Sequence, residues 1–224
     1  MSEVKVIEVK QSVFASNEQR ADLLRQQLKE DKTYLLNVMS SPGSGKTTTL
    51  SALINLLKDE MKIGVMEADI DSDVDARTIS RNTGVEAIQL HTGGMCHLDA
   101  DMVRQGITSL PDKDKYDLII LENVGNLVCP AEFDTGAVLN MCILSVPEGD
   151  DKPLKYPLMF QVSDLVVINK IDVLPYFDFD LDRCKANITY RNPKAQIFEI
   201  CAKDHSGISE LAEYIRSQIR QWQE

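Results

Sequence analysis

The residue types most suited to chemistry lie in a glycine-rich segment, residues 40–47, which reads Ser-Ser-Pro-Gly-Ser-Gly-Lys-Thr. Successive backbone N–H groups of such a loop bind phosphate oxygens, together with the N-terminus of a following helix. The pattern Gly-x-Gly-Lys-Thr is complete, although Ser40 stands where the usual phosphate-binding loop begins with Gly. A Gly/Ser turn that happens to precede a helix is the alternative. The flanking runs of strand and helix character favour a nucleoside triphosphate site.

The residues of this segment have separate expected roles. Gly permits unusual backbone angles and has no Cβ that would block a phosphate. The Lys46 ammonium is expected to reach the β and γ phosphates, and the Thr47 hydroxyl to bind Mg²⁺. The predicted phosphate-binding residues are Gly43, Ser44, Gly45, Lys46, Thr47 and Thr48.

A second motif, Asn-Lys-Ile-Asp at residues 169–172, follows a later apolar run. The Asp172 carboxylate can accept hydrogen bonds from guanine N1–H and the 2-amino group. Adenine supplies no such pair and would leave a buried carboxylate there unpaired. Asn169 is expected to hold the base edge and neighbouring loops, and the Lys170 stem to lie over the base plane.

After the next predicted strand, Ala202 and Lys203 match the loop through which GTPases contact the base with backbone groups. Cys201 stands where that loop usually has Ser. These two motifs predict GTP and GDP, rather than adenine nucleotides, as the cofactors.

Carboxylates follow two of the predicted strands. Five lie within residues 67–75, and Glu122 begins a Glu-Asn-Val-Gly sequence where many GTPases have Asp-x-x-Gly. We expect Thr47, Asp69 and Glu122 to bind the Mg²⁺ of the nucleotide, and the Gly125 N–H to meet the γ phosphate. No Gln or Arg stands out as the group that activates water, so slow hydrolysis is expected. The predicted catalytic residues are Lys46, Asp69, Asp75 and Glu122.

Two cysteines and a histidine form a candidate site for a second metal. Cys96 and His97 are adjacent in a Gly-rich loop, and Cys129 follows the Glu122 motif. Thiolate and imidazole suit Ni²⁺ and Zn²⁺. Three ligands are few for a closed site, so a site shared across a two-fold dimer would couple metal affinity to the nucleotide. The alternative is two small buried side chains and a surface histidine.

The other cysteines and histidines have simpler interpretations. Cys142 lies in an apolar run and Cys184 on a predicted helix, so both are expected to be packing residues. His91 and His205 are expected to be structural or solvated, although His91 begins the loop that carries Cys96.

The elements that must position these groups alternate along the chain. Strand character occupies 34–39, 63–68, 86–90, 116–121, 138–146, 164–168 and 196–200, and helix character occupies 15–30, 46–59, 73–82, 99–110, 178–192 and 208–223. This order predicts an α/β fold with a doubly wound, mostly parallel sheet and ligands at the carboxyl ends of the strands. We expect an N-terminal arm over 1–14, either an edge strand or disordered, and one P-loop GTPase domain over 15–224. The first helix is expected to place Leu23, Leu24 and Leu28 on one face, with Asn17 as its cap.

Composition limits the classes of partner. The chain has 224 residues, 43% of them hydrophobic, and a net charge of −11, which argues against a nucleic-acid binder. The sequence contains no apolar run long enough to span a membrane and no signal-peptide region at Met1 to Lys5. Five cysteines without framework spacing are expected to be reduced. These features predict a cytoplasmic protein without a membrane or nucleic-acid partner.

Five segments together resemble the HypB family of hydrogenase nickel-incorporation GTPases, which belongs to the SIMIBI class of P-loop proteins. The segments are residues 41–48, 91–98, 122–130, 148–157 and 169–172, in that order. The resemblance implies a metallochaperone that delivers Ni²⁺ to [NiFe]-hydrogenase precursors, with Cys96, His97 and Cys129 as its Ni²⁺ or Zn²⁺ ligands. It further implies a homodimer when GTP is bound and a small partner protein, HypA.

Some members of that family have a Cys-rich or His-rich nickel site near the N-terminus, but residues 1–33 contain neither Cys nor His. Nickel storage there is therefore not expected. Three alternatives remain: a urease accessory GTPase of the same class, a nucleotide-gated scaffold without a metal role, and a small-molecule kinase. The kinase reading leaves residues 169–172 unexplained.

Overall fold

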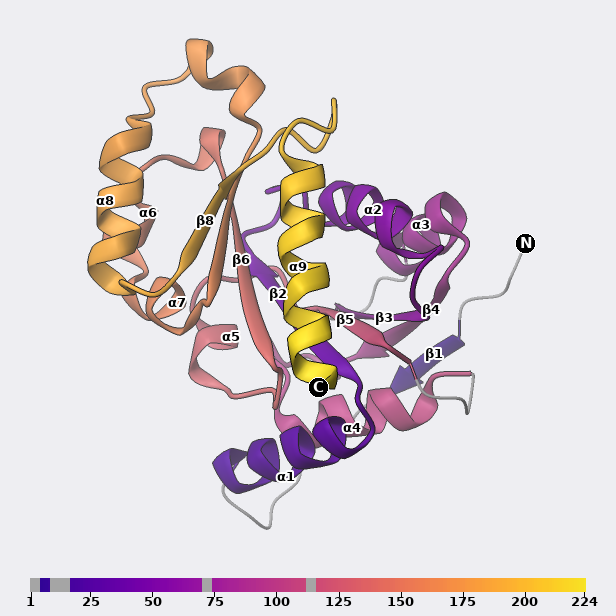
Figure 1. Ribbon diagram of the computed structural model, residues 1–224. Coiled ribbons are helices and arrows are strands. Elements are labelled where there is room, and N and C mark those ends of the chain that lie inside the picture. Colours follow the sequence, from indigo (N-terminus) through magenta and orange to yellow (C-terminus); the bar gives the residue numbers. More distant parts are fainter. Residues whose placement is uncertain (1–4, 9–16, 70–73, 112–115) are drawn as a thin grey trace.

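A computed structural model describes residues 5–8, 17–69, 74–111 and 116–224. Within these residues, eight parallel strands form one sheet in the order β1-β4-β3-β5-β2-β6-β7-β8, and helices cover both faces (Figure 1). The strands are β1 (Lys5–Glu8), β2 (Tyr34–Ser40), β3 (Ile63–Asp69), β4 (Glu86–His91), β5 (Leu118–Glu122), β6 (Leu139–Ser145), β7 (Leu165–Asn169) and β8 (Gln196–Glu199). This confirms the predicted α/β class and parallel sheet.

The helices alternate with the strands along the chain. They are α1 (Asn17–Glu30), α2 (Lys46–Leu57), α3 (Val74–Thr83), α4 (Ala100–Ser109), α5 (Cys129–Glu132), α6 (Lys152–Lys155), α7 (Pro157–Val162), α8 (Leu181–Arg191) and α9 (Ile208–Gln223), with 3₁₀ turns η1 (Val146–Glu148) and η2 (Ile171–Tyr176). Within the described residues, no helix combines the length and the apolar character needed to cross a membrane.

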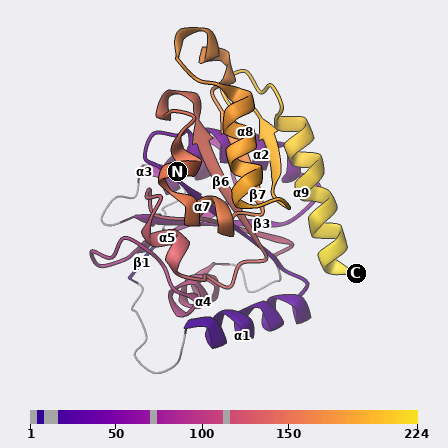
Figure 2. The same cartoon turned by 90° about the vertical axis from the view of Figure 1, so that its left-hand side faces the viewer.

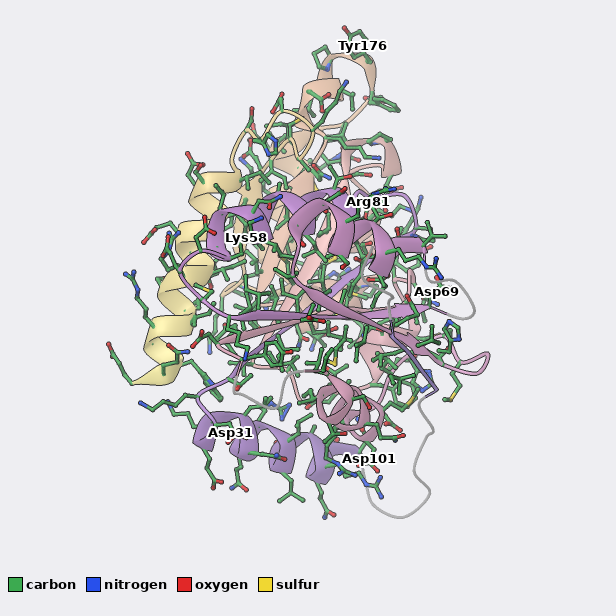
Figure 3. All side chains as sticks on the ribbon, turned by 90° about the vertical axis from the view of Figure 1, so that its right-hand side faces the viewer. Asp31, Lys58, Asp69, Arg81, Asp101 and Tyr176 are labelled. Carbon is green, nitrogen blue, oxygen red and sulfur yellow. The ribbon has the colours of Figure 1, made fainter. Side chains whose placement is uncertain are left out.

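The alternation of side chains along β2 shows how the two helical layers are built. Leu36 and Val38 lie in a core cluster with residues of α2, α3 and α9. Leu35 faces the other way and packs with α1 and α4, and Met39 packs with α5, α7 and α8. Figure 2 shows α1 and α4 below the sheet, and Figure 3 places Lys58 and Arg81 on the opposite side from Asp31 and Asp101. β2 is therefore buried on both faces, as its continuous apolar run predicts.

One detail of the N-terminal region, the position of Leu23, differs from the prediction. Leu24 and Leu28 are buried, but Leu23 is 65% exposed, because neighbouring helical residues point about 100° apart. The Asn17 side chain joins α1 to other segments: its Nδ2 donates to the Asp134 carbonyl at 2.7 Å and its Oδ1 accepts from the Ala100 N–H at 3.0 Å.

The predicted N-terminal arm is described only at residues 5–8, where β1 pairs in parallel with β4 at the sheet edge. The remainder of the predicted arm, together with residues 15–16 of the predicted first helix, lies outside the described residues. The strand over 5–8 agrees with the edge-strand alternative for that part.

Candidate functional site

The phosphate-binding loop connects β2 to α2 and depends on glycine at two positions. Gly43 and Gly45 have φ angles of 76° and 98°, in the left-handed region that other residues rarely adopt. A Cβ on Gly45 would lie 2.5 Å from Asn169 Nδ2. Gly45 therefore permits both the turn into α2 and the close approach of the Asn169 amide.

A cavity of about 580 Å³ opens beside this loop at the carboxyl ends of the strands. The sheet edge that it occupies is the one at which parallel α/β proteins bind ligands. Its lining includes ten residues singled out from the sequence: Gly43, Gly45, Lys46, Thr47, Thr48, Asp69, Asp75, Glu122, Gly125 and Lys170. Ser44, also predicted to bind phosphate, is buried behind the loop.

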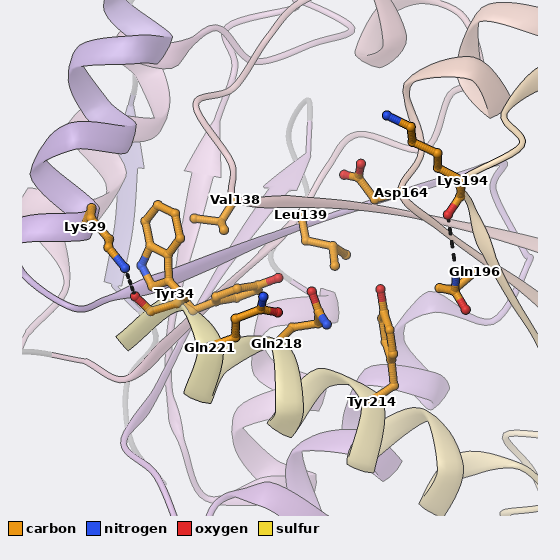
Figure 4. Close-up of a pocket in the computed structure, with 11 residues that line it drawn as sticks. Lys29, Tyr34, Val138, Leu139, Asp164, Lys194, Gln196, Tyr214, Gln218 and Gln221 are labelled. Carbon is orange, nitrogen blue, oxygen red and sulfur yellow. Dashed lines mark hydrogen bonds between the residues drawn. The ribbon is translucent and has the colours of Figure 1, made fainter. Parts of the chain in front are cut away.

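A second cavity of about 580 Å³ lies at the opposite edge of the sheet, between the strand starts and the end of α9 (Figure 4). Tyr34, Asp164 and Tyr214 are among its lining residues. None of the residues singled out from the sequence lines it, so the predicted phosphate and Mg²⁺ chemistry belongs to the first cavity.

Lys46 is held in place by the residue that departs from the usual loop pattern. Its Nζ donates to the Ser40 Oγ at 3.0 Å and lies 3.9 Å from the Glu122 Oε1. The Ser44 hydroxyl also donates to Ser40 Oγ, at 2.7 Å. Ser40 thus adds an acceptor that fixes the lysine at the floor of the cavity, where glycine would offer none.

Three carboxylates converge beside Lys46. Oxygen atoms of Glu67, Asp75 and Glu122 lie within 4.8 Å of one another, and the Thr47 hydroxyl donates to Asp75 Oδ1 at 3.1 Å. Asp69 lies at the end of β3 (Figure 3). It lines the same cavity but is not a member of this trio. Asp71 and Asp73, from the same acidic stretch, lie outside the described residues.

Glu67 is the member of the trio that the sequence interpretation did not single out. It pairs in register with Glu122 on the neighbouring strand. The period-two alternation of β3 places it on the same face as Ile63 and Val65, which α2 covers. The signal was therefore present in the strand pattern, although proximity to the strand end favoured Asp69.

Burial makes the two glutamates difficult to ionise together. Desolvation raises the pKa of Glu122 to about 7, although hydrogen bonding to Glu67 and the charge of Lys46 oppose this shift. Desolvation, followed by repulsion from Glu122, raises the pKa of Glu67 well above its usual range. Among the described residues, one oxygen of each carboxylate is buried without a hydrogen-bond partner. A divalent cation satisfies such oxygens and neutralises their charge, so the trio fits Mg²⁺.

Asn169 connects the phosphate-binding loop to both predicted base-binding segments. Its Nδ2 donates to the Ser44 carbonyl at 2.9 Å, while its Oδ1 accepts from the N–H groups of Lys170 and Ala202 at 2.7 and 3.1 Å. Lys170, with φ of 63°, donates through Nζ to the Gly43 carbonyl at 2.7 Å. One buried amide therefore joins three loops that are distant in sequence.

Asp172 and Lys203 lie at the solvent side of these loops. Both side chains are exposed, so Asp172 does not have the burial that the guanine argument assumed. Ala202, by contrast, is buried beside Asn169. The carboxylate can contact a base only at the exposed mouth of the site.

The predicted thiol and imidazole ligands also come together. Cys96 Sγ lies 2.7 Å from Cys129 Sγ and 4.0 Å from His97 Nδ1, and both cysteines are free thiols. The His97 ring stacks on Phe133 with centroids 3.6 Å apart, and its Nε2 is buried with no hydrogen-bond partner in the part of the chain that the structure describes. Burial lowers the pKa of His97, which favours the neutral ring that binds metals. The sequence did not indicate Phe133.

The remaining cysteines and histidines lie elsewhere. Cys142 and Cys184 are fully buried, as expected for packing residues, and burial raises the pKa of Cys184 to about 12. His205 is exposed, as expected. His91 is half-buried at the end of β4, and its Nε2 has no hydrogen-bond partner among the described residues.

Comparison with known proteins points to one group. Residues 33–199 match the model of the CobW/HypB/UreG nucleotide-binding domain. The chain is 42% identical to hydrogenase maturation factor HypB of Azotobacter chroococcum over 97% of its length and 71% of that protein. It is 38% identical to the hydrogenase/urease maturation factor HypB of Helicobacter pylori strain J99, over 97% of this chain and 90% of that protein.

Solved structures agree with these relatives. The crystal structure of Helicobacter pylori HypB in complex with nickel superposes with a TM-score of 0.86 at 40% identity, covering 92% of this chain and 96% of the other. The signal recognition particle receptor FtsY of Elizabethkingia anophelis has a TM-score of 0.51 at 14% identity, over 86% of this chain and 71% of the receptor, and bears on the fold alone.

Proposed function

The chain belongs to the CobW/HypB/UreG nucleotide-binding family, and from this premise we propose that it is a GTP-hydrolysing nickel chaperone for [NiFe]-hydrogenase maturation. One observation carries the proposal. The segment that begins with Glu122, the last residue of β5, supplies Glu122 and Gly125 to the nucleotide cavity and then Cys129 to the thiol pair with Cys96. A change at the phosphate end of this segment therefore acts directly on the metal ligand at its other end.

Nickel is the cargo, and Cys96, His97 and Cys129 are its proposed ligands. The two sulfurs converge, and within the described ranges no hydrogen-bond partner competes for the buried Nε2 of His97. The same donor set accepts Zn²⁺. The solved nickel complex of the Helicobacter pylori relative supports Ni²⁺ as the metal that this chain carries.

The nucleotide site supports hydrolysis with the chain's own groups in distinct roles. Lys46, oriented by Ser40, meets the β and γ phosphates. We assign Mg²⁺ binding to Thr47, Asp75 and Glu122, supported by the convergence of Glu67, Asp75 and Glu122 and by the Thr47–Asp75 hydrogen bond. Asp69 lines the same cavity. Bound Mg²⁺ neutralises the charge that develops on the phosphate oxygens. Asp75, which lines the cavity, is our candidate for positioning the attacking water, and slow intrinsic turnover is expected.

Recognition of the base is assigned to the loops that Asn169 joins. Asp172 accepts from the guanine edge, the Lys170 stem lies over the base, and the segment Ala202–Lys203 contacts the base. The phosphate groups lie against Gly43, Ser44, Gly45, Thr47 and Thr48, with the Gly125 N–H at the γ position.

The partners follow from the same premise. GTP-bound chains form a homodimer that gates metal binding and release, the small accessory protein HypA exchanges nickel with it, and the hydrogenase large-subunit precursor receives the metal. We place the protein in the cytoplasm, without a nucleic-acid or membrane partner. Urease maturation is a second candidate function, which the hydrogenase/urease name of the Helicobacter pylori relative favours.

Titration with Ni²⁺ and Zn²⁺ tests the proposal. The protein is titrated free, with GDP and with a non-hydrolysable GTP analogue, while its oligomeric state is followed. Wild-type protein should change both metal affinity and dimer content with the nucleotide. Cys96→Ala and Cys129→Ala should lose the metal, whereas Cys184→Ala, a buried thiol on α8, should keep it. If metal affinity and dimer content were the same in all three nucleotide states, the proposal of nucleotide-gated metal delivery would be wrong.

A further inference from the structure

Asn126 lies in the segment after β5, between Gly125 on the nucleotide side and Cys129 on the metal side. It is not one of the proposed ligands of the nucleotide or of the metal. Its Oδ1 accepts from the Val128 N–H at 2.7 Å and from the Cys129 N–H at 3.3 Å. Its Nδ2 donates to the Cys129 Sγ at 3.6 Å. A single amide therefore contacts both the backbone and the sulfur of Cys129.

The residue before it, Gly125, lies against the phosphate-binding loop. Gly125 lines the nucleotide cavity. A Cβ at Gly125 would lie 3.2 Å from the Pro42 Cγ and 3.4 Å from the Pro42 backbone nitrogen. One peptide bond separates this contact from Asn126, so a shift of Gly125 moves the amide that holds Cys129.

We propose that Asn126 is a positioning residue, which fixes the Cys129 thiol for metal binding and makes its position follow that of Gly125. The Oδ1 contacts close the turn from Asn126 to Cys129, so the segment moves as one piece. The Nδ2 contact orients the sulfur and supplies a hydrogen bond that remains when the sulfur binds a metal. Groups that hydrogen-bond metal ligands typically change metal affinity about 10–100-fold when removed. This inference rests on the proposed nickel function.

The two contacts of the amide can be separated by substitution. Asn126→Ala removes both. Asn126→Asp keeps an oxygen for the Val128 and Cys129 N–H groups and removes the donor to sulfur. Asn192→Ala is a matched control, because the Asn192 side chain also makes three hydrogen bonds: it donates to the Gln161 and Ser163 carbonyls and accepts from the Lys194 N–H, outside the nucleotide and metal residues.

The test measures Ni²⁺ affinity with GDP and with a GTP analogue, together with the thiolate-to-nickel absorption band. Asn126→Ala should weaken binding by about 10–100-fold and bring the ratio of the two affinities toward one. Asn126→Asp should keep more of the nucleotide dependence but shift the absorption band. Asn192→Ala can lower the melting temperature, but it should leave the affinity ratio and the band unchanged.

Failure of this inference differs from failure of the proposed function. Wild-type protein that bound no Ni²⁺ through Cys96 and Cys129 would remove the function on which the inference rests. Wild-type protein that bound Ni²⁺ in a nucleotide-dependent way, with Asn126→Ala matching it in affinity, ratio and spectrum, would overturn only the role of Asn126. If Asn126→Ala does not fold, Asn126→Asp decides: an unchanged band overturns the proposed contact to sulfur.

Discussion

The sulfur of Cys96 lies 2.7 Å from the sulfur of Cys129, although the two residues are 33 positions apart in the sequence. The first follows β4 and the second begins α5, on loops at the carboxyl side of the sheet. Only the strand order brings the two loops together, and the second of them also lines the nucleotide cavity through Gly125. The candidate metal ligands and the candidate nucleotide ligands therefore share one edge of the molecule.

Replacement of His97 tests whether its imidazole is a metal ligand or a packing group. His97→Phe keeps a ring to stack on Phe133 but removes the nitrogens, so the fold should persist while Ni²⁺ affinity falls. We expect a loss of about 10-fold or more, the lower end for disturbing a metal site. Isothermal titration measures it, with His205→Phe as the control because His205 is exposed. If His97→Phe and the wild-type protein bound Ni²⁺ with equal affinity, His97 would be a packing residue and not a metal ligand.

Gly45→Ala should abolish nucleotide binding. The new Cβ would lie 2.5 Å from Asn169 Nδ2, and a φ of 98° disfavours any side chain. Gly84→Ala is the matched control, because Gly84 has a φ of 75° and no atom within 4 Å of the added Cβ. Both variants should lose about 1–2 kcal/mol of stability from the left-handed backbone, but only Gly45→Ala should lose GTP in a fluorescent-nucleotide assay. Retained GTP affinity in Gly45→Ala would contradict the assigned site.

The buried carboxylates predict a pH-dependent stability in the absence of Mg²⁺. The pKa of Glu122 rises from 4.5 to about 7 on folding, so the folded state holds a proton that the unfolded state releases. Unfolding free energy should therefore fall as pH rises from about 4.5 to 7, by an amount on the order of 1–3 kcal/mol. Urea denaturation at pH 5 and pH 8 measures this.

Two controls separate this pH effect from other titrating groups. Glu122→Gln cannot ionise at this position and should show a smaller pH dependence. Added Mg²⁺ should restore stability at pH 8 by replacing the proton, and it should do so less in Glu122→Gln. If the unfolding free energy of the wild-type protein rose with pH over this interval, Glu67 and Glu122 would not dominate its pH dependence.

Asp172 is the test of base specificity. Asp172→Asn replaces an acceptor of the guanine N1–H and 2-amino group by an amide that donates at one position. GTP affinity should fall about 10–100-fold, as expected when one or two hydrogen bonds are lost, and xanthosine triphosphate should bind comparatively better. Competition with a fluorescent GTP analogue gives both affinities. Asp178→Asn, an exposed neighbour beyond η2, should leave both unchanged.

The sequence predicts the elements well because parallel strands buried on both faces appear as continuous apolar runs. The last helix was predicted over 208–223 and is observed over Ile208–Gln223. Strand 116–121 is observed as Leu118–Glu122, a difference at its ends only. The sequence predicts that Leu23 and Leu24 share the buried face of α1. Adjacent residues of a helix point in different directions, so Leu24 is buried and Leu23 is exposed.

Side-chain partnerships were harder to predict than elements. The motifs predict Thr47, Asp69 and Glu122 around Mg²⁺, but the carboxylates that converge are those of Glu67, Asp75 and Glu122. Glu67 belongs to this group because it pairs in register with Glu122. Phe133 and Asn126 gain their importance from loop conformations that no sequence pattern specifies. Ser40 was treated as a departure from the phosphate-loop pattern, and only the structure reveals its bond to Lys46.

The position of β2 in the sheet has a consequence for how the protein is made. β2 begins early in the chain, yet both of its neighbours, β5 and β6, are synthesised much later. The loop that follows β2 also needs Asn169, at the end of β7, to hold Ser44. A nascent chain still short of Asn169 thus carries the whole phosphate-loop sequence without the framework that shapes it. Since such distant pairings form slowly, GTP capture should begin only after most of the chain has left the ribosome.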